Sequence, residues 1–207
     1  SANAAFTSDY VSHGISQSDG HPTLQGGVDW VHPDTGIYAG LWGAGVDFKD
    51  ADVEIDVYGG ISRSVGKLTW DVGALYYYYP GAELSYKYNF WEAAAAVGYN
   101  FDVMLVTLSL NYSPNSFAAT GDAWYPAVNI NVPLPHDFSL DAGFGRQWIE
   151  KNDIAGISDY NNWLLGVNYN IEDFTLNLKY TDTDLGKPAV CPDNCNGRAI
   201  FTVSRVF

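Results

Sequence analysis

The sequence predicts an all-β fold: a closed antiparallel transmembrane β-barrel of about twelve strands, formed as a single domain by residues 1–207. Three features favour this fold. Apolar and polar residues alternate through about twelve segments, short connections alternate with longer ones, and the polar face carries many carboxylates and amides. No stretch approaches the roughly 18 consecutive apolar residues of a membrane helix, whereas a barrel strand crosses with about 9 to 11 residues.

The expected strands follow one another along the whole chain. They span residues 3–13, 23–32, 37–48, 53–65, 68–80, 88–101, 103–113, 122–133, 138–149, 160–171, 174–183 and 198–207. The last of them, RAIFTVSRVF, ends on Phe207 and is expected to close the barrel by pairing with the first strand. Its terminal aromatic residue resembles the recognition signal that barrel-insertion machinery uses.

The connections between these segments alternate in length. Short turns are expected at residues 33–36, 66–67, 100–102, 133–137 and 172–173, and mostly longer polar loops come between them, at ISQSDGHPT, KDAD, the stretch around PGAELSYK, SPNSFAATGD, EKNDIAGISD and LGKPAVCPDNCNG. Short turns at one end, longer loops at the other and an even number of strands are typical of bacterial outer-membrane barrels. This arrangement places both chain termini on the short-turn side.

Aromatic residues distinguish a membrane barrel from a soluble sandwich or a lipocalin-like barrel, which would show the same alternation. On the apolar face they gather near the strand ends, with smaller aliphatic residues between them: Trp30, Tyr38, Phe48, Trp70, Tyr78, Trp91, Tyr99 or Phe101, Phe138, Trp148, Trp163, Tyr169, Phe174 and Tyr180. Such bands are typical of the interfacial girdles of a lipid-facing surface. The sequence therefore predicts contact with membrane lipids.

The polar face is too acidic for a dry protein core. Its carboxylates are Asp9, Asp29, Glu54, Asp56, Asp71, Glu92 and Asp141. Burying so many without water or partners would cost several kcal/mol each, so this face is expected to line a hydrated lumen. The opposing charges are Lys179, Arg198 and, when protonated, His13, which predicts a negative potential that attracts cations. Four tyrosines are expected to narrow the lumen: Tyr58, Tyr77, Tyr79 and Tyr125.

Charge and cysteine content narrow the class of protein further. Ten basic residues against 24 acidic ones give a net charge of -14, so nucleic acid is excluded as a partner. The chain begins SANAAF, which is consistent with removal of a secretory signal peptide. Because secreted chains meet an oxidising compartment, Cys191 and Cys195 of the CPDNC stretch are expected to form a disulfide. That stretch lacks further ligands for a metal site, and no cofactor is expected.

Several stretches of the sequence resemble a known family. They are SDYVSHGISQSDGHPTLQGGVDW, GIYAGLWGAGVDF, VEIDVYGG, LYYYYPGA, FWEAAAAVGY, GDAWYPAVNINVPLP and TDTD, which cover nearly the whole chain in order. The chain is similar to the TorF-type porin family of proteobacterial outer-membrane proteins. The resemblance implies an outer-membrane β-barrel of the porin class and supplies no substrate and no catalytic residues.

The sequence thus predicts a porin-like channel in the outer membrane of a Gram-negative bacterium, for passive diffusion of small polar or cationic solutes. Selectivity is assigned to Glu54, Asp56, Asp71 and Glu92, with Lys179 and Arg198 as counter-charges. The alternative is a closed structural or interaction barrel, filled by hydrogen-bonded side chains, whose extracellular loops bind a partner. An enzyme is not expected, because the four histidines have no nucleophile and acid at a recognisable spacing.

Overall fold

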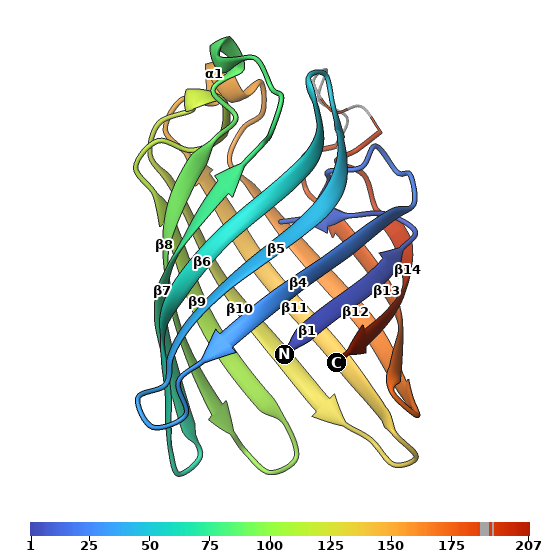
Figure 1. Cartoon of the computed structure of the whole chain (residues 1–207). Helices are drawn as coiled ribbons and strands as arrows, with labels where there is room; N and C mark the ends of the chain where they lie inside the picture. The colour runs from blue at the N-terminus through green and yellow to red at the C-terminus, as the bar shows by residue number, and fades with distance from the viewer. Residues whose placement is uncertain (187–190, 192) are drawn as a thin grey trace.

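The computed structural model describes residues 1–186, 191 and 193–207 and shows a closed antiparallel barrel of twelve strands (Figure 1). The barrel strands are β1 (Ala2–Thr7), β4 (Thr23–Val31), β5 (Ile37–Phe48), β6 (Ala51–Val65), β7 (Leu68–Tyr78), β8 (Phe90–Asn100), β9 (Leu105–Ser113), β10 (Ala123–Pro133), β11 (Phe138–Ile149), β12 (Tyr160–Ile171), β13 (Phe174–Thr183) and β14 (Arg198–Val206). A separate hairpin contains β2 (Val11–Ser12) and β3 (Ile15–Ser16). The loops contain short helices η1 (Leu84–Tyr86), η2 (Phe117–Ala119) and α1 (Asn152–Ala155). Within the described residues, every helix is too short to span a lipid bilayer.

The observed strands confirm most of the predicted ones. β5, β11, β12 and β13 have the predicted bounds, and the other barrel strands apart from β1 differ by at most two residues at either end. The predicted first strand, 3–13, is wrong beyond residue 7. After Thr7 the chain leaves the sheet, and the next strand along the chain that pairs with β1 is β4.

The barrel closes between the first and last strands, as the sequence predicts. β1 pairs antiparallel with β14, from Asn3 opposite Val206 to Thr7 opposite Thr202. The backbone amide of Phe207 also donates to the carbonyl oxygen of Ala2 at 2.8 Å. The terminal residues are therefore part of the closed ladder, which leaves no free sheet edge.

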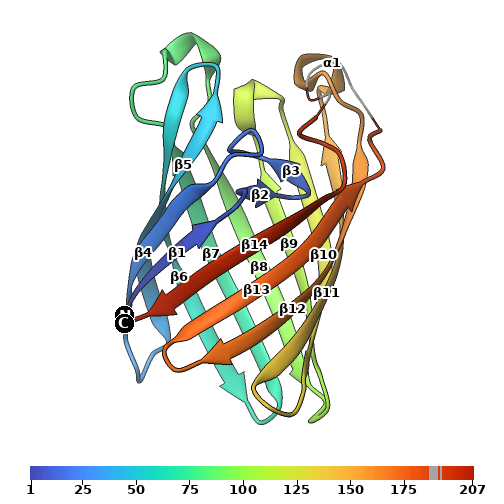
Figure 2. The same ribbon diagram turned by 90° about the vertical axis from the view of Figure 1, so that its right-hand side faces the viewer.

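Short turns lie at one end of the barrel and most of the longer loops at the other (Figures 1 and 2). Both termini lie toward the short-turn end, above the tips of the turns. The connection between β5 and β6 is short although it lies at the loop end. These two strands have 12 and 15 residues, so at this point the barrel wall is extended by long strands, and a short turn takes the place of a long loop.

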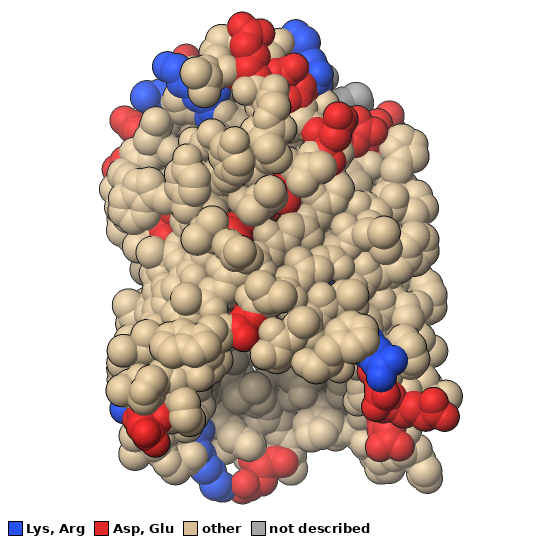
Figure 3. Space-filling model, in the orientation of Figure 1, with Lys and Arg blue, Asp and Glu red and all other residues tan. Residues whose placement is uncertain are grey.

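Apolar side chains point outward around the barrel. Leu24, Leu108 and Leu165 are between 60% and 70% exposed, a fraction that suits lipid rather than water. Charged side chains gather mainly at the two ends of the molecule, and the wall between them is largely uncharged (Figure 3). A chain with this fold and this exterior is a transmembrane barrel.

Two of the predicted girdle residues point inward instead. The hydroxyl of Tyr38 donates to Asp71 in the lumen, and the ring of Phe48 packs against Tyr79 and Phe117 at the loop end. On β5 both faces are apolar, so alternation alone does not show which face meets lipid.

Candidate functional site

The first long loop, residues 8–22, folds back into the barrel and is here called the inserted loop. It contains the hairpin β2–β3, which Figure 2 shows inside the outline of the strands. His13 and Gly14 at the hairpin tip both have positive φ, of 47° and 84°. A Cβ on Gly14 would lie 2.7 Å from both Asn162 and Thr183 on the opposite wall, so only glycine fits there.

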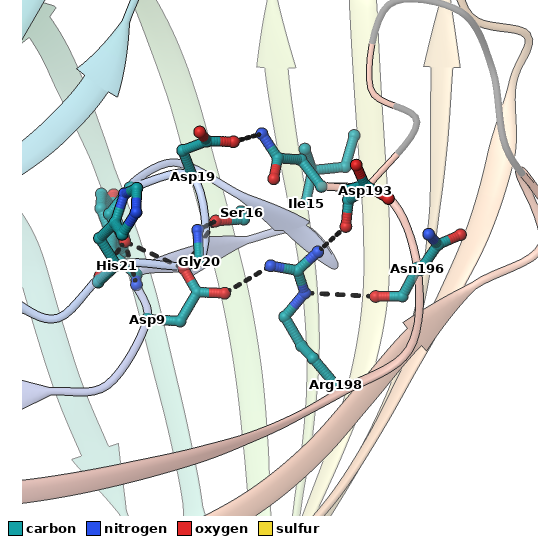
Figure 4. Close-up of polar contacts among 12 residues, drawn as sticks. Asp9, Ile15, Ser16, Asp19, Gly20, His21, Asp193, Asn196 and Arg198 are labelled. Atoms are coloured by element: carbon teal, nitrogen blue, oxygen red, sulfur yellow. Dashed lines mark hydrogen bonds and ion pairs between the residues drawn. The ribbon is translucent and has the colours of Figure 1, made fainter.

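A buried ion pair holds the base of the inserted loop. Asp9 accepts hydrogen bonds from Ser16 at 2.6 Å, Ser18 at 2.9 Å and the guanidinium of Arg198 at 2.6 Å (Figure 4). The side chains of Asp9 and Arg198 are 6% and 15% exposed. Arg198 also donates to the carbonyl oxygens of Asp193 and Asn196. Its charge is therefore committed to the loop and to the following chain segment.

The tip of the inserted loop contacts the far wall through His13. Its ring stacks on Tyr125 with centroids 3.5 Å apart, and Nδ1 lies 3.0 Å from Oε1 of Gln147. Asn162 donates to the His13 carbonyl oxygen at 2.9 Å. Burial lowers the pKa of His13, although the charge of Glu92 acts in the opposite direction. The loop thus spans the lumen from β1 to the wall formed by β10, β11 and β12.

Strands β4 to β8 carry what is here called the acidic wall, defined by Asp29, Glu54, Asp56, Asp71 and Glu92. Tyrosine hydroxyls donate to four of these carboxylates: Tyr10 to Glu54 at 2.7 Å, Tyr79 to Glu54 at 2.5 Å, Tyr77 to Glu92 at 3.1 Å, Tyr38 to Asp71 at 2.9 Å, and Tyr58 to Asp29. A phenol satisfies a carboxylate oxygen without adding positive charge. The wall therefore remains strongly negative.

Asp56 differs from the other members of the acidic wall. It accepts no hydrogen bond from any described residue, its Oδ1 atom is fully buried, and the residue is 6% exposed. It lies between Trp42 and Tyr77 in the sheet, two positions from Glu54 on the same strand. An unpaired buried carboxylate beside another acid is a costly arrangement.

Strands β10 to β13 carry what is here called the amide wall, defined by Asn131, Asp141, Asn168, Asn177 and Lys179. Asp141 accepts from Asn131 at 2.7 Å and from Asn168 at 2.5 Å, and Asn177 donates to Asn168 at 2.7 Å. Lys179 and Asp141 are both paired with Gly166 in the sheet, on opposite sides of it. This wall therefore has one negative and one positive side chain, linked by neutral amides.

Two cavities lie in the lumen and share no lining residue. The loop-side cavity, of about 380 Å³, is lined by the inserted loop, by the aromatic rings of Phe48, Tyr77, Tyr79, Phe90 and Phe117, and by Glu54 and Glu92. The turn-side cavity, of about 310 Å³, is lined by the amide wall and by Thr107 and Asn129. The side chain of Asn162, which meets the tip of the inserted loop, lies one inward position along β12 from Leu164 of the turn-side cavity.

The structure places the predicted lumen residues in three groups. Five of the seven carboxylates lie on the acidic wall, Asp141 and Lys179 lie on the amide wall, and Asp9 is paired with Arg198. Of the four predicted constriction tyrosines, Tyr77 and Tyr79 line the loop-side cavity. The other two lean over glycines, since a Cβ on Gly40 would lie 2.4 Å from Tyr58 and one on Gly145 would lie 2.3 Å from Tyr125.

Sequence reasoning missed the residues that the inserted loop brings into the lumen. Tyr10 is the main example, because its hydroxyl reaches Glu54 and its ring lies against Trp42 at 5.4 Å. The signal that could have found it is His13-Gly14, a pair suited to a tight turn inside the predicted first strand. The inward orientation of Trp42 and Phe48 had no comparable signal.

The loop that carries both cysteines, between β13 and β14, packs against the inserted loop. Cys191 and Cys195 form a disulfide, and Thr183 donates to the Cys195 carbonyl oxygen at 2.7 Å. Ser16 of the inserted loop donates its amide to the Asn194 carbonyl oxygen at 2.9 Å. At the exposed loop surface nearby, ligand atoms of Asp19, His21 and Asp47 lie within 4.8 Å of one another, the one such trio found in the described part of the chain.

Comparisons with known proteins agree with this fold. A family model described as "Bacterial protein of unknown function (Gcw_chp)" matches residues 1–207, and no curated protein sequence matches the chain. The NanC porin has a TM-score of 0.69 at 9% identity, covering 100% of this chain and 99% of that one. The KdgM porin in complex with disordered oligogalacturonate has a TM-score of 0.63 at 8% identity, covering 100% and 98%.

A third solved structure of similar size is LpxR from Salmonella typhimurium, with a TM-score of 0.51 at 8% identity and 100% coverage of both chains. At such low identities the similarity is one of fold. The predicted porin-like barrel is thereby confirmed, and the finer assignment to TorF-type porins stays a prediction.

Proposed function

We propose that this chain, which belongs to the Gcw_chp family, forms an outer-membrane channel for passive diffusion of small cationic and neutral polar solutes. The observation that carries the proposal is the acidic wall. Four of its five carboxylates accept hydrogen bonds from tyrosine hydroxyls, and in the described residues none of the five is paired with arginine or lysine. No cation of the protein therefore offsets the negative charge of this wall, which leaves the lumen attractive to cations.

The charge balance of the lumen supports the same direction of selectivity. Within the described residues, Asp9 is the one lumen carboxylate in an ion pair with arginine or lysine. Lys179 lies on the amide wall beside Asp141, away from the acidic wall. We assign selectivity to Glu54, Asp56, Asp71 and Glu92, and narrowing of the passage to the four lumen tyrosines, Tyr58, Tyr77, Tyr79 and Tyr125.

The structural neighbours support the proposal of a channel, but they do not indicate that this chain takes the same solutes as those porins. The KdgM porin was solved with oligogalacturonate, a polymer that carries a carboxylate on each sugar. The same ligand would meet the five carboxylates of the acidic wall here, and like charges repel. We therefore expect cations and neutral solutes to pass more readily than anions.

Conductance across a planar lipid bilayer tests the proposal. With a potassium chloride gradient, we expect a reversal potential that shows preference for potassium. The double variant Asp56→Asn, Glu92→Gln is expected to lower the potassium-to-chloride permeability ratio several-fold, because two of the charges that set the lumen potential are removed. Asp173→Asn, at an exposed turn, is the matched control and should leave the ratio unchanged. Anion preference, or no current at all, would contradict a cation channel.

A closed structural or interaction barrel is the second candidate. The inserted loop favours it, because the loop crosses the lumen and is fixed at both its base and its tip. In that case the wild-type protein and a variant weakened at the Asp9–Arg198 pair would both fail to conduct. An extracellular partner would then be expected to bind the long loops.

We expect no catalysis by this chain. LpxR shares the barrel fold and is an enzyme, but fold alone does not carry an activity. His13 is engaged with Gln147 and stacked on Tyr125, and neither neighbour is an acid or a nucleophile of a triad. We also expect the chain to reach the outer membrane with a signal peptide and to be recognised by barrel-insertion machinery through its terminal strand.

A further inference from the structure

The loop-side cavity combines aromatic rings with carboxylates. Phe90 stacks on Tyr77 with centroids 4.3 Å apart, and Phe117 lies 5.7 Å from Tyr79 and 5.4 Å from Phe48. These five rings come from β5, β7, β8 and η2 or from the residues that directly follow those strands. They make an apolar surface inside a barrel whose interior is otherwise polar.

Three carboxylates line the same cavity: the exposed Asp47, which lies 3.4 Å from His21, and the buried Glu54 and Glu92. One of the two buried carboxylates has an oxygen without a hydrogen bond. Glu54 is fully occupied, since Tyr10 donates to Oε1 and Tyr79 to Oε2. Glu92 is 7% exposed, and both of its donors, Tyr77 at 3.1 Å and Asn111 at 3.0 Å, bind Oε2. Oε1 of Glu92 accepts no hydrogen bond from any residue that the structure describes.

A further carboxylate, Asp56, lies close to Glu54 and Glu92 but does not line the cavity. It lies two positions from Glu54 on β6, and its sheet partner Tyr77 is the residue that donates to Glu92. Its Oδ1 atom is buried without a partner. No lysine or arginine lines the cavity in the described residues, so these carboxylates have no local counter-charge.

This combination suits a particular chemical class of ligand. An aromatic ring attracts a cation through the negative potential of its face, and the attraction is strong where water is excluded. A free carboxylate oxygen accepts a charge-assisted hydrogen bond from an ammonium group. A bare divalent metal would instead need about six or more oxygen ligands, which the rings do not provide. A cavity of about 380 Å³ is large enough for a small organic molecule.

We propose that the loop-side cavity binds compact organic ammonium ions, with the carboxylate of Glu92 holding the ammonium group and the rings of Phe90 and Phe117 covering its apolar part. This inference rests on the cation-conducting function proposed above and names the solute class of that channel. It makes primary amines with a short apolar body the preferred solutes, ahead of inorganic cations of the same charge.

Binding to the purified barrel in detergent tests the site without requiring any current. Calorimetric titration with benzylamine is expected to show binding, whereas benzyl alcohol and benzoate, which share the ring but lack the ammonium group, should bind at least tenfold more weakly. The variant Glu92→Gln should lose about tenfold or more in benzylamine affinity. Asp141→Asn, on the amide wall, is the control and should keep the wild-type affinity.

The aromatic part of the site is tested by Phe90→Leu together with Phe117→Leu. This variant should weaken benzylamine binding several-fold while leaving the weak binding of potassium unchanged, because leucine fills space without a ring quadrupole. The heat-dependent shift of the folded barrel in gel electrophoresis confirms that each variant is folded. Phe90→Tyr keeps a ring face and should therefore keep the wild-type affinity if the leucine variant loses binding through the ring.

Channel measurements separate this inference from the proposed function. Benzylamine should reduce potassium current through the wild-type channel at concentrations near its measured affinity, and the Glu92→Gln variant should resist this block. Cation selectivity without amine binding would overturn the inference and leave the channel in place. Amine binding by a barrel that does not conduct would overturn the channel and support the site. Equal binding of benzylamine and benzyl alcohol would overturn the ammonium preference.

Discussion

The acidic wall and the amide wall both keep polar side chains hydrogen-bonded inside the barrel, but they differ in how their negative charge is balanced. Each places polar side chains on the inner face of four neighbouring or nearly neighbouring strands, and each satisfies most of them by hydrogen bonds. On the acidic wall the donors are phenols and the acceptors keep their full charge. On the amide wall a single carboxylate is surrounded by asparagine amides and shares its wall with Lys179.

The difference teaches that hydrogen bonding and charge balance are separate properties of a lumen. A hydrogen bond to a carboxylate removes the free-energy penalty of an unpaired acceptor, but only a nearby cation cancels the electric field of the negative charge. The inserted loop joins the two walls, because Tyr10 reaches Glu54 on one side and His13 reaches Asn162 on the other. Breaking that loop, or changing one wall at a time, therefore tests the comparison.

The largest effect is expected from Arg198→Ala. Removing the guanidinium leaves Asp9 buried without its counter-charge, and breaking one partner of a buried pair costs about 3–5 kcal/mol. We expect faster hydrogen exchange in residues 8–22 and a larger, noisier conductance as the loop leaves its position between the walls. The matched control is Arg205→Ala on the same strand, whose pair with Asp173 is exposed and should cost about 0–1 kcal/mol. Equal effects of the two variants would show that the loop is held by other contacts.

An intermediate effect is expected from the same substitution made on each wall. Asp141→Asn gives the amides of Asn131 and Asn168 a partner that carries two donors and only one acceptor oxygen, so the free energy of unfolding should fall by about 1–2 kcal/mol. Asp56→Asn removes a buried charge that has no donor, so the free energy of unfolding should rise, by about 1 kcal/mol. Urea unfolding of the barrel in lipid vesicles, followed by tryptophan fluorescence, measures both. If both variants raise the free energy of unfolding, or both lower it, the two walls do not differ in how their carboxylates are stabilised.

The smallest effect is expected from pH, through His13 at the contact of the inserted loop with the amide side. Burial lowers the pKa of this histidine in the folded protein, so the unfolded chain takes up the proton first as the pH falls. Stability should therefore be greatest above about pH 6.5, the ordinary histidine value, and decrease below it until the lowered pKa is passed. Hydrogen exchange of residues 8–22 at pH 7.5 and 5.5 measures this. His13→Gln should remove the dependence, and a dependence that persists in that variant must come from another group.

The strands and their faces could be predicted because they depend on local alternation. β11, β12 and β13 pair in register with apolar side chains outward, as the sequence implies. β5 shows where this reasoning fails, because Ile37 and Tyr38 begin two faces that are both apolar. Side-chain fit decides the orientation: Gly40 lies opposite Tyr58 in the sheet, and the absence of a side chain there lets the Tyr58 ring lie over β5 and reach Asp29 on β4.

The candidate site could be predicted in composition and not in arrangement. Six of the lumen carboxylates were recognisable from strand parity, whereas Asp9 lies in the inserted loop outside the strands, and the individual partners were not recognisable. Glu54 meets Tyr10 although 44 positions separate them, and Asp9 meets Arg198 across 189 positions. The periodicity of the sequence does not indicate which of these distant residues meet, because each contact depends on where the inserted loop lies.

The sequence by itself determined the number of strands, their order, the lipid-facing sides of the strands whose two faces differ in polarity, and the acidity of the interior, because a two-residue repeat and a lipid exterior leave few other solutions. Tertiary structure alone decided the path of residues 8–22, the division of the lumen into an acidic and an amide wall, and the meeting of aromatic rings with Glu92. Closure of the barrel brings distant segments face to face, and only then do the shapes and charges of their side chains select which of them touch.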